Sequence, residues 1–333
     1  MSDVLLEHVT RSIEAGSKSF AAASRLFAPD VRRGALMLYA WCRHCDDVID
    51  GQVSGMTLIE APPAGGTSVS GLNPAPEARL ASLVAATQAA YAGQPMAEPA
   101  FAAFQEVATD YSIPSAYAFE HLAGFEMDVM GHHYETIDDT MTYCYRVAGV
   151  VGLMMARIMG VQDERTLDRA CDLGLAFQLT NIARDIAEDA RLGRCYVPAA
   201  WLRDAGVTRA DMIRPEHTHA LSSLAVRLVD YAEPYYRSAD AGIPALPWRS
   251  AWAVAAASNV YREIGIKLKA RAPRDVAVRM STTRLDKLRL ISTAAGFTLA
   301  SRVQSATPRP AGLWDRPAVP DSTNRRASPA SVA

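Results

Sequence analysis

Residues 171–189 read CDLGLAFQLTNIARDIAED and place a line of polar side chains on an otherwise apolar helix. Apolar residues recur at helical spacing, namely Leu173, Ala176, Phe177 and Ile182. Asn181, Asp185 and Asp189 follow one another at intervals of four residues, so their side chains project from one side of that helix. Because unpaired charge is costly to bury, an inner line of this kind indicates a ligand site. The alternative is a solvated face that carries an ordinary surface ion pair.

A second acidic pair follows the apolar run GALMLYAW at residues 34–41. Asp46 and Asp50 lie one helical turn apart on one face, with Arg43 one turn before them, while Asp47 points elsewhere. Carboxylates at this spacing repel each other by about 0.2–0.5 kcal/mol unless a cation lies between them. Acidic pairs also occur on solvated helices, so this pair predicts a metal site only together with the first line.

Two facing lines of oxygen ligands suit a hard cation. Mg²⁺ prefers carboxylate and amide oxygens and keeps positions for water and phosphate oxygens. Such a site binds a diphosphate and makes it a better leaving group, because it neutralises the charge that develops as the C–O bond breaks. Apolar walls then suit a hydrocarbon tail, and aromatic faces suit a carbocation. The residues therefore predict metal-assisted ionisation of an apolar diphosphate.

The helical pattern continues through most of the chain. Half of the 333 residues are hydrophobic and 21% are charged, a composition that excludes a disordered chain. No sustained alternation typical of strands is found, so we predict one all-α domain over residues 1–304. Residues 51–77 are rich in Gly, Pro and Ser and predict a long loop, and the Pro/Ser/Arg-rich residues 305–333 predict a disordered tail.

Charge and cysteine content exclude several kinds of protein. The net charge of −2 provides no global field for holding nucleic acid, so no nucleic-acid partner is expected. Five cysteines are an odd and sparse number, which argues against a disulfide framework, and the CxxC at residues 42–45 is interpreted as helix packing rather than a redox pair. His132 and His133, with Asp128 and Glu135 nearby, are interpreted as a solvated helix end rather than as metal ligands.

The N-terminal and apolar segments predict a cytoplasmic protein. The first twenty residues carry early acids and lack the apolar core of a signal peptide. The most apolar stretch, residues 147–161, is interrupted by Arg157 and is too short to span a bilayer. We therefore expect a cytoplasmic protein that is at most peripherally associated with a membrane.

Five motifs of the chain together resemble the squalene/phytoene synthase family, and especially the bacterial phytoene synthases of carotenoid pathways. These motifs are SKSF (17–20), YAWCRHCDDVID (39–50), YCYRVAGVVG (143–152), QLTNIARDIAED (178–189) and GRCYVP (193–198). The resemblance covers about residues 5–300, and several long motifs in the same order make it specific. It implies an isoprenoid-synthase-type helical bundle around a central apolar cavity.

The resemblance also implies roles for individual residues. Asp46 and Asp50 would hold Mg²⁺ on one wall, and Asn181, Asp185 and Asp189 would hold it on the other. Contacts to diphosphate or substrate are implied for Ser17, Lys18, Ser19, Phe20, Tyr39, Arg43, Gln178, Arg184, Tyr196, Tyr261 and Arg279. The four aspartates, Tyr39 and Arg43 would carry the catalytic chemistry.

In family terms, two molecules of geranylgeranyl diphosphate are joined head to head through the cyclopropyl prephytoene diphosphate to give phytoene. The implied cofactor is Mg²⁺, with Mn²⁺ as a substitute and no nicotinamide, and either released diphosphate or a tyrosine would act as the final base. Contacts with a membrane for product release, and with other carotenoid-pathway enzymes, are expected partners. Squalene synthase with NADPH and dehydrosqualene synthase, both using farnesyl diphosphate, are alternatives, and a non-catalytic helical scaffold is a remote one.

A row of small side chains follows Phe20 and bears on substrate length. If Ala21, Ala22, Ala23 and Ser24 belong to a helix that lines the pocket, a small residue at position 24 leaves depth for a long chain. The alternative is that these residues only allow two helices to pack closely.

Overall fold

The computed structural model describes residues 23–53, 56–57, 74–271, 282–303 and 307–318. Within these described residues, the first helices are α3 (Pro29–Asp50), α4 (Pro76–Tyr91), α5 (Pro99–Asp110), α6 (Ser115–Val129), α7 (Ile137–Cys144), a π-helical turn η1 (Tyr145–Gly149) and α8 (Val150–Ile158). The later elements are α9 (Glu164–Arg191), α10 (Ala199–Asp204), η2 (Arg209–Asp211), η3 (Pro215–His217), α11 (Thr218–Asp240), η4 (Ile243–Ala245), α12 (Trp248–Arg271) and α13 (Arg284–Ser301). The predicted site residues Ser17, Lys18, Ser19, Phe20 and Arg279 lie outside the described residues.

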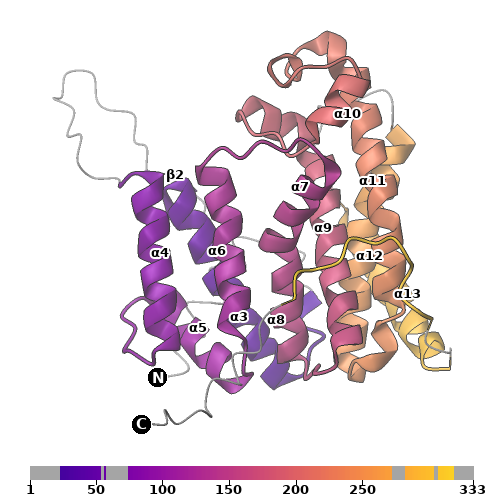
Figure 1. Ribbon diagram of the computed structural model, residues 1–333. Coiled ribbons are helices and arrows are strands. Elements are labelled where there is room, and N and C mark those ends of the chain that lie inside the picture. Colours follow the sequence, from indigo (N-terminus) through magenta and orange to yellow (C-terminus); the bar gives the residue numbers. More distant parts are fainter. Residues whose placement is uncertain (1–22, 54–55, 58–73, 272–281, 304–306, 319–333) are drawn as a thin grey trace, which may run out of the picture.

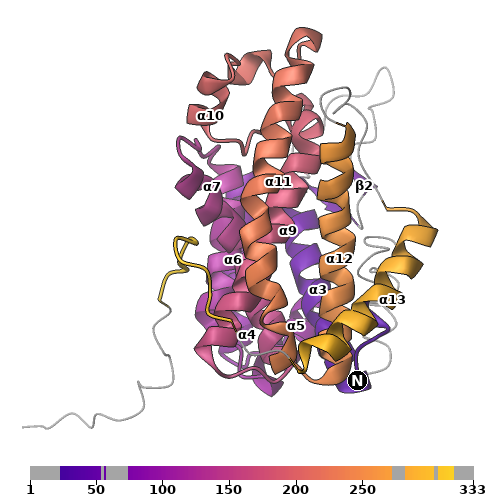
Figure 2. The same cartoon turned by 90° about the vertical axis from the view of Figure 1, so that its right-hand side faces the viewer.

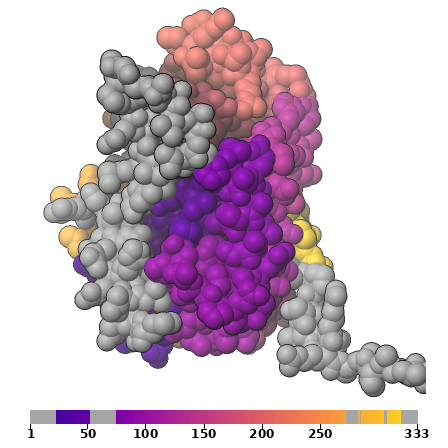
Figure 3. Space-filling view, turned by 90° about the vertical axis from the view of Figure 1, so that its left-hand side faces the viewer, coloured from indigo at the N-terminus to yellow at the C-terminus, as the bar shows by residue number. Residues whose placement is uncertain are grey.

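The helices form a bundle with two sides, which confirms the predicted all-α fold. Helices α3 to α6 form one side, α9 and α11 to α13 form the other, and α7, η1 and α8 lie between them (Figure 1). The long helices run along a common direction, and α13 crosses α12 obliquely (Figure 2). On the side of α4, helices of the first half form the lower surface, and the segment around α10 rises above them (Figure 3). The cavity described below lies between the two sides.

Among the described residues of the predicted loop, 51–77, two short strands pair with each other. Strands β1 (Gln52–Val53) and β2 (Met56–Thr57) pair antiparallel, and α4 begins at Pro76, just before the predicted end of the loop. Gly51 ends α3 in the left-handed conformation, with φ of 67°, which glycine adopts without strain. This glycine stops the helix directly after Asp50.

Helix α9 packs unusually closely on the segment formed by η1 and α8. A Cβ on Gly174 would overlap with the backbone carbonyl of Ala148, and a Cβ on Gly152 would overlap with the carbonyl of Ala170. Only glycine permits this backbone approach. The close packing fixes the position of α9, and therefore of its polar line, relative to the rest of the bundle.

The predicted disordered tail is wrong for residues 307–318. Arg309 donates two hydrogen bonds of 2.9 Å to the buried Asp172 of α9, and Arg316 donates one of 2.7 Å to Asp168. The backbone N–H of Trp314 donates to the hydroxyl of Tyr235 on α11, at 3.0 Å. This segment crosses the bundle as a strap (Figure 1). Composition alone did not predict this ordered segment, because the residues that it contacts lie far away in the sequence.

Two other expectations can be compared with the structure. All five cysteines are free thiols, which confirms that the chain has no disulfide framework. None of the helices in the described part of the chain combines the length and the apolar character needed to cross a bilayer.

Candidate active site

An apolar cavity of about 380 Å³ runs along α9 between the two sides of the bundle. It is bounded by Thr166 at one end of α9 and by Asn181 at the other, which corresponds to about 22 Å at a rise of 1.5 Å per residue. Ala23 and Phe27 belong to its wall, whereas Ser24 is buried outside the lining. Ser24 therefore does not line the pocket as the hypothesis required. Its neighbour Ala23 is the residue of that row that borders the cavity.

Polar side chains gather at one end of this cavity. Tyr39, Gln178, Asn181 and Tyr261 line it there, so four of the predicted residues meet from α3, α9 and α12. Tyr261 stacks on Phe177, with the ring centroids 4.2 Å apart. Burial raises the pKa of Tyr39 and that of Tyr261, so both phenols remain neutral.

The acidic residues of α3 lie on one wall of this mouth. Arg43 bridges Asp46 at 3.0 Å and Asp47 at 2.5 Å, so one guanidinium neutralises part of the wall. Asp47, which helical phase predicted to point elsewhere, is thus held by the same arginine as Asp46. Burial raises the pKa of Asp46 to about 6, and the charge of Arg43 opposes this rise.

The acidic residues of α9 form the opposite wall. Arg184 donates two hydrogen bonds, of 2.8 and 2.5 Å, to the carboxylate of the neighbouring Asp185. Asp189 lies one turn further on; burial, reinforced by the charge of Asp185, raises its pKa to about 7. Both walls therefore hold carboxylates whose negative charge is costly in the absence of a cation.

The donor set suits Mg²⁺. All five predicted ligands present oxygen atoms, which hard cations prefer. The side-chain oxygen of Asn181 is buried and has no hydrogen-bond partner among the described residues, while its amide nitrogen donates to Gln178 at 3.3 Å. In the described part of the chain, no three His, Cys, Asp or Glu side chains form a ready-made metal cluster. The predicted ligands are therefore two walls that a cation would bridge.

Arg194 connects the two walls and was missed by sequence reasoning. It follows the end of α9, where its backbone N–H donates to the carbonyl of Asp189 at 2.8 Å. Its guanidinium donates to Asp50 of α3, also at 2.8 Å. Burial opposes this charge, but Asp50, Tyr196 and Asp128 raise the pKa of Arg194 above its usual value. The motif GRCYVP contains this arginine, so a signal for it was present.

Asp128 corrects another prediction. Instead of forming a solvated helix end with His132 and His133, it accepts hydrogen bonds from the hydroxyls of Tyr143 and Tyr196. The exposed His133 does pair with Glu135, at 3.2 Å, so the surface interpretation is confirmed for that pair. Tyr196 is almost fully buried and is not part of the cavity lining. The position of Asp128 in the sequence did not predict that its side chain points inward.

The comparisons with known proteins agree with this architecture. The family model described as squalene/phytoene synthase matches residues 13–289. A 15-cis-phytoene synthase of Pantoea ananas is 56% identical over 313 residues, covering 94% of this chain and 98% of the relative. One of Enterobacter agglomerans is 58% identical over 305 residues, covering 92% and 100%.

Solved structures show the same fold. A dehydrosqualene synthase in complex with a ligand superposes with a TM-score of 0.75 at 25% identity, covering 89% of this chain and 97% of that one. The squalene synthase HpnC of Alicyclobacillus acidocaldarius, at 23% identity, superposes with a TM-score of 0.67 and covers 80% and 94%. Two acidic walls at the mouth of an apolar cavity, together with a family match over most of the sequence, place this chain in the squalene/phytoene synthase family.

Proposed function

We propose that this prenyltransferase is a phytoene synthase, which joins two molecules of geranylgeranyl diphosphate to give phytoene and two diphosphates. The observation that carries the proposal is the position of the two acidic walls, which meet at one end of a long apolar cavity. A prenyl diphosphate has the same division into a charged head and an apolar tail. The names of the relatives that are 56% and 58% identical support the same reaction.

The proposal includes Mg²⁺ as cofactor. Asp46 and Asp50 would hold it on the α3 wall, and Asn181, Asp185 and Asp189 would hold it on the α9 wall. When bound, Mg²⁺ neutralises the diphosphate and makes it a better leaving group. The unpaired side-chain oxygen of Asn181 and the raised pKa of Asp189 support this assignment, because the first is a buried acceptor without a donor and the second is a carboxylate whose negative charge is costly to bury.

The side chains around the mouth have separate tasks in this proposal. Arg43, Arg184 and Arg194 supply positive charge to the diphosphate, as guanidinium groups bind phosphate oxygens in pairs. Gln178 orients Asn181 through its hydrogen bond. The stacked rings of Phe177 and Tyr261 present aromatic faces close to the place where a prenyl cation forms.

The order of events follows from this division. Ionisation of the first substrate gives an allylic cation, which alkylates the double bond of the second and, with loss of a proton, forms a cyclopropane. A second ionisation, rearrangement and proton loss give phytoene. Water would trap each cation, so the apolar walls contributed by Val151, Leu173 and Val260 exclude it.

Product analysis tests the proposal against its two alternatives. Purified protein is incubated with Mg²⁺ and either geranylgeranyl or farnesyl diphosphate, with and without NADPH, and the products are separated by chromatography. We expect phytoene from geranylgeranyl diphosphate and no effect of NADPH. Dehydrosqualene as the main product would establish the farnesyl-using alternative, and NADPH-dependent squalene would establish the reductive one. No product under any condition would support a non-catalytic scaffold.

We also propose that the enzyme contacts a lipid surface, where its oily product is passed to the next enzyme of the pathway. The outward side of α13 supports this, because Leu285, Leu288 and Leu299 are largely exposed there. Co-sedimentation with vesicles containing anionic lipid tests it. We expect Leu285→Ser/Leu288→Ser to weaken binding at least about tenfold, since each inserted CH₂ contributes about 0.8 kcal/mol and tenfold corresponds to only about 1.4 kcal/mol. Ile213→Ser, at an equally exposed position on another face, is the matched control. Equal binding of both variants would contradict the assignment.

A further inference from the structure

The cavity ends, away from the acidic walls, where α8 is followed by α9 and where α11 is followed by η4. Its lining there includes five residues that we call the floor, namely Met159, Thr166, Arg169, Gly242 and Ile243. Asn181 borders the cavity near the other end of α9, so most of this helix separates the floor from the walls. Arg169 is the one charged residue among the five. An arginine in an apolar lining needs partners for its guanidinium, because unpaired charge is costly to bury.

Arg169 places its aliphatic stem on the floor and turns its guanidinium toward residues that do not line the cavity. One guanidinium nitrogen donates to the carbonyl of Ser238 on α11 at 2.8 Å, and the other donates to the carbonyl of Thr307 in the strap. The stem contacts Gly242, since a Cβ added to this glycine would lie 3.0 Å from both Cβ and Cδ of Arg169. Long cationic side chains commonly cover apolar surface in this way. A methyl group fits at Gly242 only if Arg169 shifts.

The partners of the guanidinium are themselves held in place. The hydroxyl of the buried Ser238 donates to the buried carboxylate of Asp172 at 2.6 Å. The same carboxylate accepts two hydrogen bonds of 2.9 Å from Arg309 of the strap. The position of Arg169 is therefore determined by α11 and the strap rather than by the contents of the cavity.

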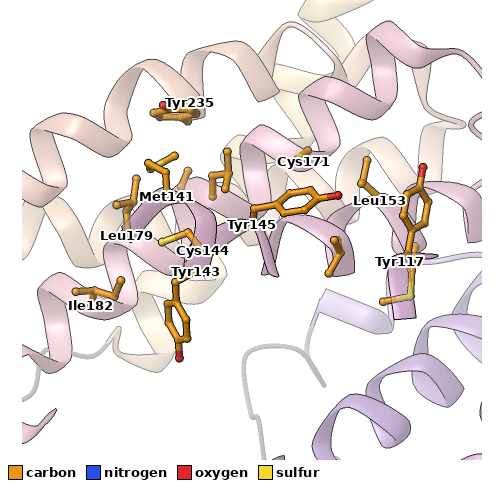
Figure 4. Packing of buried hydrophobic residues seen from close by; sticks show 14 of the residues in the cluster. Tyr117, Met141, Tyr143, Cys144, Tyr145, Leu153, Cys171, Leu179, Ile182 and Tyr235 are labelled. Atoms are coloured by element: carbon orange, nitrogen blue, oxygen red, sulfur yellow. The ribbon is translucent and has the colours of Figure 1, made fainter. Parts of the chain in front are cut away.

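The backbone of α9 is also fixed at this end. On its other face, Cys171, Leu179 and Ile182 pack into the buried hydrophobic cluster (Figure 4). On the cavity side, Gly174 brings α9 into backbone contact with η1. Close-packed interiors resist displacement, so a cavity that ends at a packed helix and an anchored side chain has a fixed depth.

This depth matches one length of prenyl chain. Helix α9 rises about 22 Å from Thr166 to Asn181, at 1.5 Å per residue. C–C bonds of about 1.5 Å advance an extended chain by about 1.25 Å per carbon, so the sixteen-carbon main chain of a geranylgeranyl group extends about 20 Å. At the same spacing, one isoprene unit adds or removes about 5 Å. A C25 chain would therefore overrun the floor, and a C15 chain would leave space above it.

We propose that Arg169 and Gly242 set the longest prenyl chain that the enzyme accepts. The stem of Arg169 occupies the space that the last isoprene unit of a longer chain would need. Gly242 keeps the floor low, because a side chain at this position would push Arg169 into the cavity. Both residues lie far from the acidic walls, so they determine specificity without acting on the reacting carbons. This inference rests on the proposed function, which places a prenyl diphosphate in the cavity.

Two substitutions with opposite expected effects test the inference. The measurement is kcat/KM for farnesyl, geranylgeranyl and geranylfarnesyl diphosphate, which carry 15, 20 and 25 carbons. Arg169→Ala lowers the floor and should raise the ratio of geranylfarnesyl to geranylgeranyl diphosphate at least about tenfold. Gly242→Val raises the floor and should raise the ratio of farnesyl to geranylgeranyl diphosphate at least about tenfold. A single methylene in an apolar pocket already gives about 10- to 200-fold discrimination. General damage to the protein would not produce two shifts of opposite direction.

Two control variants separate the floor from the stability of the strap. Arg169→Lys retains a stem of four carbons and should keep both ratios within about threefold of the wild type. Arg316→Gln removes strap hydrogen bonds to Asp168 and Glu164 without touching the cavity lining, so it should lower Tm and leave both ratios unchanged. If Arg169→Ala or Gly242→Val does not fold, Arg169→Gln and Gly242→Ala carry the test with smaller shifts, of about threefold, in the same two directions.

Binding of non-ionising thiolodiphosphate analogues of the three chain lengths gives a second readout, by calorimetry in the presence of Mg²⁺. The variants should show the same order of preference, because contact with the floor acts on the bound chain before ionisation.

Three results would overturn the inference. They are unchanged ratios in folded Arg169 and Gly242 variants, shifts of both variants in the same direction, or an equal shift in Arg316→Gln. Wild-type protein that binds the analogues but makes no phytoene would contradict the proposed function instead, so the two failures are distinguishable.

Discussion

The guanidinium of Arg194 lies 2.8 Å from Oδ1 of Asp50, and this ion pair joins the turn after α9 to the last turn of α3. Both partners remain partly accessible, with 46% of the Arg194 side chain and 26% of the Asp50 side chain exposed. The pair therefore lies at the opening between the two acidic walls rather than in the core. If Asp50 binds Mg²⁺ as proposed above, an arginine in this position would become available to a diphosphate.

Arg194→Gln should lower kcat/KM for geranylgeranyl diphosphate at least about tenfold, since it removes about 1.4 kcal/mol or more of charge complementarity to the diphosphate. Steady-state kinetics at saturating Mg²⁺ measure this. Arg227→Gln is the matched control, because Arg227 pairs with Asp204 on the surface and should leave kinetics unchanged. Equal kcat/KM of the two variants would show that Arg194 only stabilises the turn after α9.

Asp46→Asn and Asp185→Asn should each lower turnover at least about 100-fold, or about 2.7 kcal/mol of barrier, because each removes one carboxylate from the leaving-group site. Asp230→Asn, which disrupts a surface pair with Lys269, is the control and should have normal turnover. Near-normal turnover of both site variants at saturating Mg²⁺ would refute the assignment of the walls.

Removal of divalent metal by EDTA should abolish activity, and Mg²⁺ or Mn²⁺ should restore it, whereas Zn²⁺ should support it poorly. The reason is the all-oxygen donor set, which suits hard ions better than zinc. The measurement is the rate of product formation after stepwise addition of each metal. Full activity in the chelator would contradict metal-assisted ionisation.

The stability of the metal-free protein should fall as pH rises from about 4 toward 8. Burial raises the pKa of Asp189 to about 7 in the folded state, so between its unfolded value and pH 7 the folded protein binds more protons than the unfolded one. Stability then decreases with increasing pH. Mg²⁺ should raise Tm more at pH 8 than at pH 5, since it replaces the lost protons. Thermal unfolding of the wild type and Asp189→Asn checks this. The variant should show a flatter pH profile, and an identical one would exclude Asp189 as the source.

The strap should contribute measurably to stability. Arg309→Ala leaves the buried carboxylate of Asp172 without its guanidinium partner, and breaking a buried pair in this way costs about 3 kcal/mol. Urea denaturation should therefore show a lower midpoint. Asp172→Asn combined with Arg309→Ala should be less destabilised than the sum of the two single variants. A strictly additive result would mean that the two residues do not interact in solution.

The sequence by itself determined the helices and the composition of each acidic wall. Asp46 and Asp50, or Asp185 and Asp189, share a helix face because four residues are close to one helical turn, and this relationship needs no tertiary contact. Leu173 and Phe177 lie one helical turn apart on the cavity side of α9 for the same local reason.

Only the tertiary structure decided which distant residues meet those walls. Asp128 turns inward because α6 brings it within hydrogen-bond distance of Tyr143 and Tyr196, and its spacing along the chain contains no trace of these partners. The strap is ordered because Arg309 donates hydrogen bonds to Asp172 of α9, which lies 137 residues earlier in the sequence. Helical periodicity is a property of neighbouring residues. Charge pairing across the bundle depends instead on how whole helices pack, and the close backbone contact at Gly174 is one example of such packing.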